Sequence, residues 1–178
     1  MDMSSDGRGI AVRELVLRRF SGDIGAADPP HVIRQYVAGA DDAAVTGLAA
    51  RVAEASAGGG PRPRTAGLLA ELRGRPCRSV HGWLAWPREA EVGCDTAASG
   101  LVTLVESRDR GAAARWSIGW LLVRPEVRRQ GVGRALVATA VGHARAAGAE
   151  AVWAETSAAW PAAAFWQALG FESAGREA

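Results

Sequence analysis

The stretch RPEVRRQGVGRAL, residues 124–136, constrains the fold of this chain more than any other part of the sequence. The run at 115–123 that precedes it is rich in β-branched and aromatic residues and reads as a strand. Pro125 ends that strand, because proline lacks a backbone donor and restricts the residue before it. A run with helical spacing follows at about 133–147, and Gly148 stands where a helix would end. The sequence therefore predicts a strand, a turn rich in Gly and Arg, and a helix, in that order.

The start of this predicted helix has the properties of an anion site. First-turn amides of a helix have no partner inside the helix, and the helix dipole adds positive charge there. Gly131 and Gly133 lack the Cβ atoms that would keep a phosphate away from the backbone. Arg128, Arg129 and Arg134 add positive charge, and each guanidinium can bind two phosphate oxygens at once. On these residues alone, a Gly-rich helix start with solvated arginines remains the alternative.

Two common phosphate-binding loops do not account for this stretch. The P-loop requires a Lys before its Ser or Thr, and the chain contains no Lys. The dinucleotide fingerprint G-x-G-x-x-G matches only at its first two glycines, because Leu136 occupies the third position. The sequence therefore excludes a P-loop protein and disfavours a dinucleotide-binding fold.

The first part of the chain reads as one strand followed by helices. Residues 12–20 alternate apolar and charged side chains, which favours a strand. Residues 27–57 have helical spacing, with Asp28 before two prolines as the start of the helix. The Gly- and Pro-rich segment 57–64 reads as a linker, and a short helix is expected after Thr65. The helix over 27–57 is expected to bury two stripes, Val32, Tyr36 and Val37, and Val45, Leu48 and Val52.

The remaining segments complete a layered α+β pattern. Residues 79–86 and 100–107 read as strands joined by a polar hairpin loop, and 151–157 reads as a further strand. The segment 161–171 predicts a last helix, with Pro161 at its first turn and Gly170 just past its end. The order of these elements predicts an α+β fold, or a three-layer α/β fold, with a mixed sheet.

Composition limits the class of protein. The 178 residues suffice for one domain, expected at 10–178 after a tail at 1–9. The net charge of +2 does not indicate a basic face for nucleic acid, and the absence of Lys excludes a Schiff-base mechanism. The polar N-terminus has no signal-peptide core, and no apolar run approaches the length of a membrane span. A soluble cytoplasmic protein is therefore expected.

The metal-binding side chains are few and scattered. Cys77 and Cys94 make neither a disulfide framework nor a metal site, and no evident base lies near them in the sequence. His31, His81 and His143 lack the spacing of metal ligands, and the last two are expected to be structural. No metal is therefore expected.

Two motifs together resemble one enzyme family. The sequence RRQGVG at residues 128–133 resembles the acetyl-CoA signature of the GNAT superfamily of N-acetyltransferases, [RQ]-x-x-G-x-[GA]. Further on, AAAFWQALGF at 162–171 resembles the family's second signature helix, A-x-x-[FL]-Y-x-x-x-G-F. Both stand at the family's spacing, and the resemblance extends from Val80 to Phe171. It implies a GNAT acyltransferase fold, with a mixed, mostly antiparallel twisted sheet flanked by helices, and acetyl-CoA as cosubstrate.

The resemblance also implies how the donor binds. Amides of the Gly-rich loop would take the CoA pyrophosphate, and the end of the strand at 115–123 would pair with the pantetheine arm. In the family a β-bulge splays this strand from the next one, and Gly119 is the expected bulge site. A backbone N–H near Leu122 would polarise the thioester carbonyl. The implied donor-binding residues are Leu121, Leu122, Val123, Arg128, Arg129, Gln130, Gly131, Val132, Gly133, Arg134 and Trp166.

The chain departs from the family pattern where proton chemistry is concerned. The family often places a Tyr as the acid that protonates the leaving thiolate, and Trp166 stands there instead. An indole N–H cannot donate a proton at neutral pH, although the ring can pack along the pantetheine. A frequent Asn at the start of this helix is replaced by Ala159. Either another group or water is then expected to protonate the thiolate.

The general base is not settled by the sequence. No carboxylate lies on the strand at 115–123, where related enzymes often carry one. Glu155, on the neighbouring strand, is the preferred base, with a solvated strand residue as the alternative. Glu106 is a weaker candidate, and Tyr36 is expected to line the core or the substrate pocket.

The aromatic residues and the C-terminus raise two further expectations. Trp116 and Trp120 lie four apart on one predicted strand and are therefore expected on one face, with Trp153 on the neighbouring strand. The family continues with two strands after G-F, so a shortened, missing or replaced last strand is expected. An open sheet edge invites pairing, and a homodimer is the resulting prediction.

The acceptor is the least determined part. The resemblance implies direct attack of an amine on the thioester in a ternary complex. A primary amine of a small molecule, of an aminoglycoside-like kind, is the first choice. Acetylation of a protein or aminoacyl-tRNA amine, and a non-catalytic acyl-CoA-binding module, are the alternatives. Neither a membrane nor a nucleic-acid partner is expected.

Overall fold

The computed structural model describes residues 14–20, 24, 31–56, 65–74, 78–88, 98–108, 113–157 and 162–173. Several residues that the sequence singled out lie outside these ranges: the tail, Asp28, the segment 57–64, both cysteines and Ala159. None of the helices in these ranges is long and apolar enough to cross a membrane. Likewise, these ranges contain no cluster of three or more potential metal-binding side chains.

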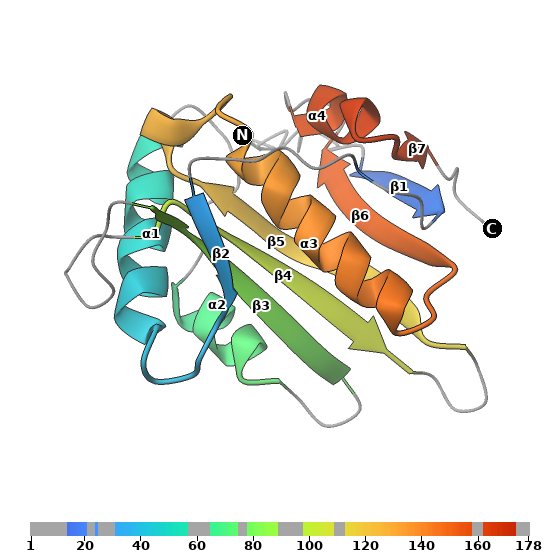
Figure 1. The fold of residues 1–178 in the computed structure, drawn as a ribbon, viewed down its shortest axis with the longest axis horizontal. Helices are drawn as coiled ribbons and strands as arrows, with labels where there is room; N and C mark the ends of the chain where they lie inside the picture. The colour runs from blue at the N-terminus through green and yellow to red at the C-terminus, as the bar shows by residue number, and fades with distance from the viewer. Residues whose placement is uncertain are drawn as a thin grey trace, which may run out of the picture.

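The described strands form one seven-stranded sheet with the order β2-β3-β4-β5-β6-β1-β7 (Figure 1). β5 and β6 run parallel, and all the other neighbours run antiparallel. The predicted mixed, mostly antiparallel sheet is therefore confirmed. The strands are β1 Glu14–Phe20, β2 His31–Gln35, β3 Arg78–Pro87, β4 Gly100–Ser107, β5 Arg115–Val123, β6 Ala151–Ser157 and β7 Glu172–Ser173.

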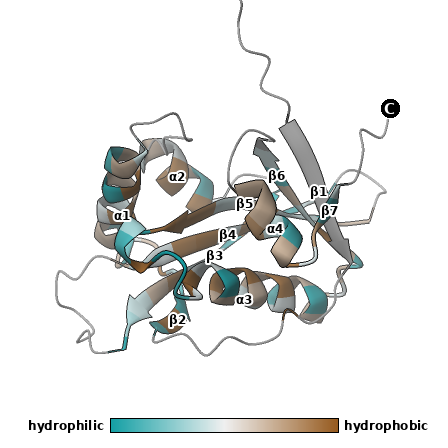
Figure 2. Ribbon diagram, turned by 90° about the horizontal axis from the view of Figure 1, so that it is seen from above, coloured by the Kyte–Doolittle hydropathy of each residue, from teal (hydrophilic) through white to brown (hydrophobic). Residues whose placement is uncertain are grey.

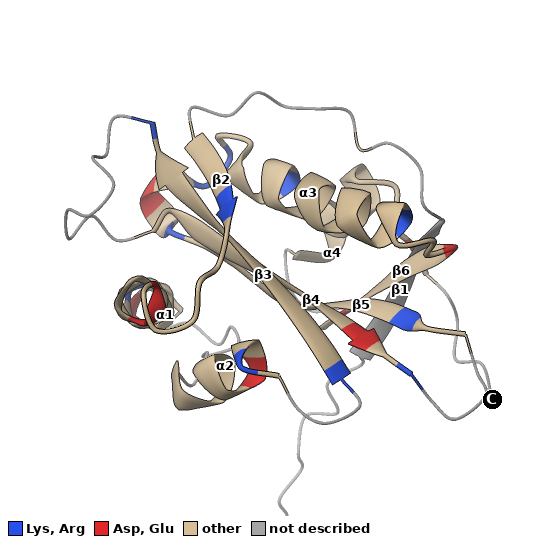
Figure 3. Cartoon of the chain, turned by 60° about the horizontal axis from the view of Figure 1, so that its bottom comes forward, with Lys and Arg blue, Asp and Glu red and all other residues tan. Residues whose placement is uncertain are grey.

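Helices cover both faces of the sheet and give three layers (Figures 2 and 3). α1 (Asp42–Ala55) and α2 (Thr65–Leu72) pack on one face, which we call the α1/α2 face. α3 (Val132–Ala146) and α4 (Ala162–Ala168) pack on the other, the α3 face. A short 3-10 turn, η1 (Pro125–Val127), connects β5 to the loop before α3. The α+β layered class predicted from the sequence is confirmed.

The central strands are apolar on both sides because each side meets a helical layer. On β3, Trp83 and Ala85 belong to the core under α3, whereas Leu84 between them belongs to the core under α1 and α2. On β4, Val102 and Leu101 divide in the same way. Alternation along each strand therefore builds two separate cores from one sheet.

The helix predicted over 27–57 is only half correct. α1 covers the second half, and its stripe of Val45, Leu48 and Val52 is buried as expected. His31–Gln35 is instead an edge strand that pairs with β3. The stripe expected from Val32 and Val37 does not form, since these side chains are 50% and 54% exposed. An edge strand buries one side only, and that pattern can mimic a short amphipathic helix.

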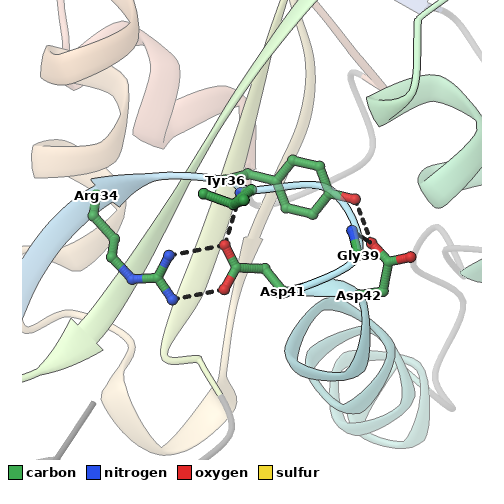
Figure 4. Close-up of polar contacts among 6 residues, drawn as sticks. Arg34, Tyr36, Gly39, Asp41 and Asp42 are labelled. Carbon is green, nitrogen blue, oxygen red and sulfur yellow. Dashed lines mark hydrogen bonds and ion pairs between the residues drawn. The ribbon is translucent and has the colours of Figure 1, made fainter. Parts of the chain in front are cut away.

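Two aspartates hold the turn between β2 and α1 (Figure 4). Asp41, almost fully buried, accepts two hydrogen bonds from the Arg34 guanidinium at 2.6 and 2.8 Å and one from the Val37 N–H. Burial alone would raise the pKa of Asp41, but the Arg34 and Val37 hydrogen bonds outweigh it and lower the pKa. The carboxylate is thus charged and fully engaged, and it fixes α1 relative to β2.

Asp42 makes a second set of contacts on the same turn. It accepts hydrogen bonds from the Tyr36 hydroxyl at 2.5 Å, from the Gly39 N–H at 3.1 Å and from Arg73 at 2.8 Å. Arg73 follows α2, so Asp42 connects α1 to the end of α2. The two helices of the α1/α2 face are therefore joined by one carboxylate.

The edge beside β6 is covered within the chain. β1 pairs antiparallel with all seven residues of β6, and the two-residue β7 pairs with β1 on its other side. Among the described residues, the strand that follows the G-F pair is β7, and the N-terminal strand β1 takes the position next to β6. Because β1 already covers that edge, the homodimer that an open edge suggested stays a prediction.

Alkaline unfolding should reveal the Tyr36–Asp42 contact. Burial of the ring and the hydrogen bond to Asp42 raise the pKa of Tyr36 to about 12, from 10.0. Between these values the unfolded chain has lost the phenolic proton that the folded chain keeps, so stability falls as pH rises through the window. The loss is expected to be on the order of 1 kcal/mol after solvent screening, measured by urea unfolding.

The composition makes this measurement clean, because the chain has one Tyr and no Lys that would titrate in the same range. Tyrosinate absorbance of the folded protein would give the pKa directly. Tyr36→Phe keeps the ring and removes the titrating group, and it should not show this added loss. An equal loss in the variant would contradict the assignment.

Candidate active site

A β-bulge interrupts the pairing of β4 with β5. Val102 is opposite Leu121 and Leu104 is opposite Ile118, so two residues of β5, Gly119 and Trp120, oppose the single residue Thr103. The Trp120 N–H donates to Thr103 Oγ1 at 2.8 Å, which takes the place of a ladder hydrogen bond. The bulge expected at Gly119 is therefore confirmed.

Beyond the bulge, β5 separates from β6. The parallel pairing joins only Trp116–Ile118 to Val152–Ala154, and the arrowheads of β5 and β6 point apart in Figure 1. The end of β5, from Leu121 to Val123, pairs with β4 alone. One backbone edge of these three residues is therefore turned toward the space between the two strands, which we call the slot.

The orientation of the backbone shows which amides face the slot. The Leu122 carbonyl oxygen lies only 2.9 Å from where a Cβ on Gly100 would stand, so it points toward β4. The Arg124 N–H, two residues later, also points that way and donates to Ser99 O at 2.9 Å. The two backbone groups of one strand residue point to the same side, and neighbouring residues alternate. The Leu122 amide thus faces β4, and the Leu121 and Val123 amides face the slot.

This geometry corrects one predicted role. A donor to a reacting carbonyl in the slot must come from an amide that faces the slot. Leu122 does not meet that condition, and its side chain is buried in the core under α1 and α2. The oxyanion-hole role expected of a backbone N–H near Leu122 is therefore proposed for the amide of Leu121.

The loop between β5 and α3 turns sharply at two residues with left-handed backbone. Arg129 has φ 62° and Gly131 has φ 84°, and Gly131 is the N-cap of α3. The first hydrogen bond of the helix runs from the Ala135 N–H to Gly131 O at 2.9 Å. The amides of Val132, Gly133 and Arg134 come before it, so they have no carbonyl within the helix to bind. The observed loop thus has the backbone donors that the sequence predicted for an anion.

Charge surrounds these amides. Arg128, Arg129, Gln130 and Arg134 are exposed. Arg128 Nε also donates to Val123 O at 3.2 Å, which ties the loop to the end of β5. The nearby acid is Glu126, which forms ion pairs of 3.6 Å with Arg124 and 4.0 Å with Arg51. Because the Glu126 side chain is exposed, these pairs contribute little to stability. The loop therefore presents a net positive surface at the start of α3.

α4 approaches the same loop. Phe165 lies against Gly133, where an added Cβ would come within 3.4 Å of the ring. Trp166 is buried and packs edge-on against Phe165 and Phe171. Gly170, φ 79°, lies in the turn after the helix, and the Phe171 N–H donates to Trp166 O. The Trp166 ring is thus part of the core, and its contact with a bound donor stays a prediction.

The bulge also changes which tryptophans share a face. Trp116 is buried under α3, near His81 and His143, whereas Trp120 packs on the α1/α2 face. The expectation that Trp116 and Trp120 lie on one face is therefore wrong. An unbroken strand would have placed them together, but the extra residue of a bulge reverses the alternation.

The carboxylates differ in position relative to the slot. Glu155 is exposed and follows Ala154, the last β6 residue paired with β5. Its neighbours Ala154 and Thr156 are buried, so Glu155 belongs to the α1/α2 face. Glu106 lies opposite Trp116, at the far end of β5, and forms a salt bridge with Arg108 at 2.5 Å. Of the two predicted candidates, only Glu155 lies at the slot.

A further carboxylate, which the sequence did not single out, meets the bulge from α2. Trp120 Nε1 donates to Glu71 Oε2 at 3.1 Å, and Glu71 Oε1 lies against Gly119. The only sequence signal was a Glu on the inner face of a short helix. Nothing local connects it to a strand that begins more than forty residues later.

The histidines are placed as structural groups. His81 on β3 and His143 on α3 lie with ring centroids 4.4 Å apart, beside Trp83 and Trp116. Burial, and then the nearby His143, lower the pKa of His81, which Glu106 opposes only in part. The pair packs under α3, on the face opposite Glu71 and Glu155, and the structural role expected of both histidines stays a prediction.

Comparison with known families agrees with this geometry. The model of the family described as Acetyltransferase (GNAT) family matches residues 61–171. A comparison with curated protein sequences finds no match. The matched range contains α2, the bulge, the slot, the Gly-rich loop and α4.

Solved structures with the same fold are distant in sequence. A tandem GNAT protein from the clavulanic acid biosynthesis pathway is 17% identical with a TM-score of 0.68, over 93% of this chain and 51% of that one. The chain thus spans about half the length of that protein. A GNAT-family protein from Desulfovibrio desulfuricans is 23% identical (TM-score 0.59, 80% and 85% covered). AAC(6')-Iy, in complex with the bisubstrate analogue CoA-S-monomethyl-acetylneamine, is 20% identical (TM-score 0.59, 82% and 93% covered).

Two glycine substitutions should have opposite effects on stability. A Cβ at Gly119 would collide with Glu71 Oε1 and come within 2.8 Å of Thr103 Oγ1. Gly119→Ala should therefore lower the free energy of unfolding by about 1–3 kcal/mol, measured by urea denaturation. In α3, Gly142 has nothing within 4 Å of an added Cβ. Gly142→Ala should raise stability by about 0.5–1 kcal/mol through helix propensity. Equal effects would contradict the tight packing at the bulge.

Proposed function

Because the chain belongs to the GNAT acetyltransferase family, we propose that it transfers the acetyl group of acetyl-CoA to a primary amine of a small molecule. The observation that carries the proposal is the slot between β5 and β6, with the Gly-rich start of α3 beside it. The slot leaves the backbone edge of Leu121–Val123 without a strand partner, with Val123 O bound by the Arg128 side chain, and the loop offers amides and arginines for phosphate. Few other ligands need both features at once.

The residues that would hold the donor follow from these two features. The amides from Gln130 to Arg134 would bind the pyrophosphate, with Arg128, Arg129 and Arg134 supplying charge. Leu121 and Val123 would pair their backbone with the pantetheine arm as an added strand does. Bound there, acetyl-CoA supplies an activated acetyl group as a thioester. Trp166 would support the site through Phe165, which lies against Gly133.

The chain's own groups would then assist the transfer. The Leu121 amide would donate to the thioester oxygen as negative charge develops on it. The buried Trp166 gives no proton to the leaving sulfur, so water is the proposed proton source. A thiol with an ordinary pKa near 8.5 is a good enough leaving group for this. A carboxylate on the α1/α2 face would bind the amine and accept its proton, and Glu155 is the base predicted from the sequence.

The proposed acceptor is a small cationic amine. At the slot, the α1/α2 face presents the carboxylates Glu71 and Glu155, which favour a positively charged ligand. The AAC(6')-Iy structure holds an analogue that joins CoA to acetylneamine, an amine of this kind. At 20% identity this similarity supports the fold, and the acceptor class rests on the charges.

The donor site can be tested by binding. A glutamate at Gly131 would place a like charge at the phosphate site and force a side chain into a left-handed backbone position. Gly131→Glu should weaken CoA binding by at least about 100-fold in calorimetry, the effect expected when two hydrogen bonds to phosphate no longer form. Gly142→Glu adds the same charge to the solvent side of the same helix and should leave CoA binding unchanged.

Activity provides the second arm of the test. Wild-type protein with acetyl-CoA and a panel of small amines, including spermidine and kanamycin, should release free CoA, detected with a thiol reagent. Unchanged CoA affinity in Gly131→Glu would contradict the donor site. Tight CoA binding without CoA release for any amine would contradict the transferase and favour a binding module.

A further inference from the structure

Glu71 reaches the bulged part of β5, beside the slot, from a helix and not from a strand. α2 lies on the α1/α2 face, and its last turn brings the Glu71 carboxylate against Gly119, where β5 bulges. The Trp120 indole N–H holds Oε2 at 3.1 Å. The bulge makes this contact possible, because it turns the Trp120 side chain toward α2 and leaves a bare Cα at Gly119. One carboxylate is thereby fixed beside the point where the strands separate.

The second oxygen of this carboxylate has no partner. Glu71 Oε1 is buried and accepts no hydrogen bond within the part of the chain that the structure describes. A carboxylate oxygen shielded from water without a donor is costly. A donor that arrives with a ligand would remove that cost. Rotation about the last side-chain bond of Glu is broad, so the carboxylate can turn Oε1 toward the slot while Trp120 keeps hold of the group.

Glu155 is a less suitable proton acceptor than Glu71. Glu155 is exposed on β6, so its charge is screened by water. Glu71 is half-buried, oriented by Trp120 and in contact with Gly119. A general base is most effective when its position is fixed close to the proton that it removes.

We propose that Glu71 is the catalytic residue that binds the acceptor's ammonium group and removes its proton, which leaves Glu155 as a surface charge that attracts the cation. This rests on the proposed acetyl transfer. Glu71 takes one proton from R–NH₃⁺, and the neutral nitrogen then attacks the thioester carbon and forms the C–N bond. The C–S bond breaks, and a second proton from the nitrogen reaches the thiolate through water. Glu71 afterwards releases its proton to solvent, so the products are the N-acetyl amine, free thiol and one proton.

The test compares three isosteric Glu→Gln variants. Glu71→Gln keeps an oxygen for the Trp120 indole but removes the charge, and should lower kcat/KM by about 100-fold or more. Its CoA affinity should be unchanged, and its melting temperature should stay within about 2 °C of wild type. Glu155→Gln should cost less than about tenfold, mainly in KM. Glu150→Gln, at the opposite end of β6, is exposed and should have no effect.

A separate readout distinguishes catalysis from support of the fold. The rate of wild-type enzyme should fall at acidic pH as the base is protonated, and Glu71→Gln should lose that limb. Trp120→Phe removes the indole donor and keeps the carboxylate, so it should retain the acidic limb with kcat lowered by less than about tenfold. Activity of Glu71→Gln within about threefold of wild type would overturn the proposal. So would an acidic limb that disappears only in Glu155→Gln.

If wild type releases no CoA with any amine, the proposed function fails but Glu71 is still tested. Calorimetric titration of spermidine and kanamycin into the CoA-bound protein then decides the question. Binding that Glu71→Gln weakens by at least about tenfold, while Glu150→Gln does not, would support Glu71 as the ammonium-binding group. Equal binding by both variants, or no binding to wild type, would overturn it.

Discussion

The bulge at Gly119 and Trp120 determines the geometry on which the rest of the site depends. Two residues of β5 oppose Thr103, whose hydroxyl accepts the Trp120 N–H in place of a ladder partner. A bulged strand bends and twists away from its neighbour, and here the parallel pairing with β6 ends at Ile118. The free edge of β5 and the start of α3 therefore come to lie beside one opening. Without the bulge the two strands would pair to their ends, and no backbone edge would be available for a ligand.

The same extra residue separates the proposed donor site from the proposed acceptor site. Before the bulge Trp116 faces α3, and within it Trp120 faces α2. The arginines and the amides at Gly131 gather around the start of α3, while Glu71 and Glu155 occupy the α1/α2 face. A polyanionic donor and a cationic acceptor would then approach from different sides of the sheet.

The sequence predicts correctly those elements that are determined by neighbouring residues in the chain. β5, α3 and the end of α4 follow from a strand-like run and from positive-φ glycines, as at Gly148 and Gly170. His31–Gln35 is different, because it becomes a strand only through pairing with β3, a partner some fifty residues away. Glu71 escaped prediction for the same reason. Its significance depends on a contact with Trp120, which no helical periodicity encodes.

The position of β1 explains how the sheet tolerates an opening in its middle. The end of β6, from Glu155 to Ser157, has lost β5 as a partner, and unpaired backbone groups are costly when buried. β1 pairs with this same segment, where Val16 is opposite Glu155 and Glu14 is opposite Ser157. The N-terminal strand thus satisfies the outer edge of β6 along its full length, including residues 155–157, whose other edge faces the slot. The separated end of β5 has the corresponding support from β4. Each strand beside the slot is therefore held from its outer side, so the inner edges can stay apart without either strand leaving the sheet.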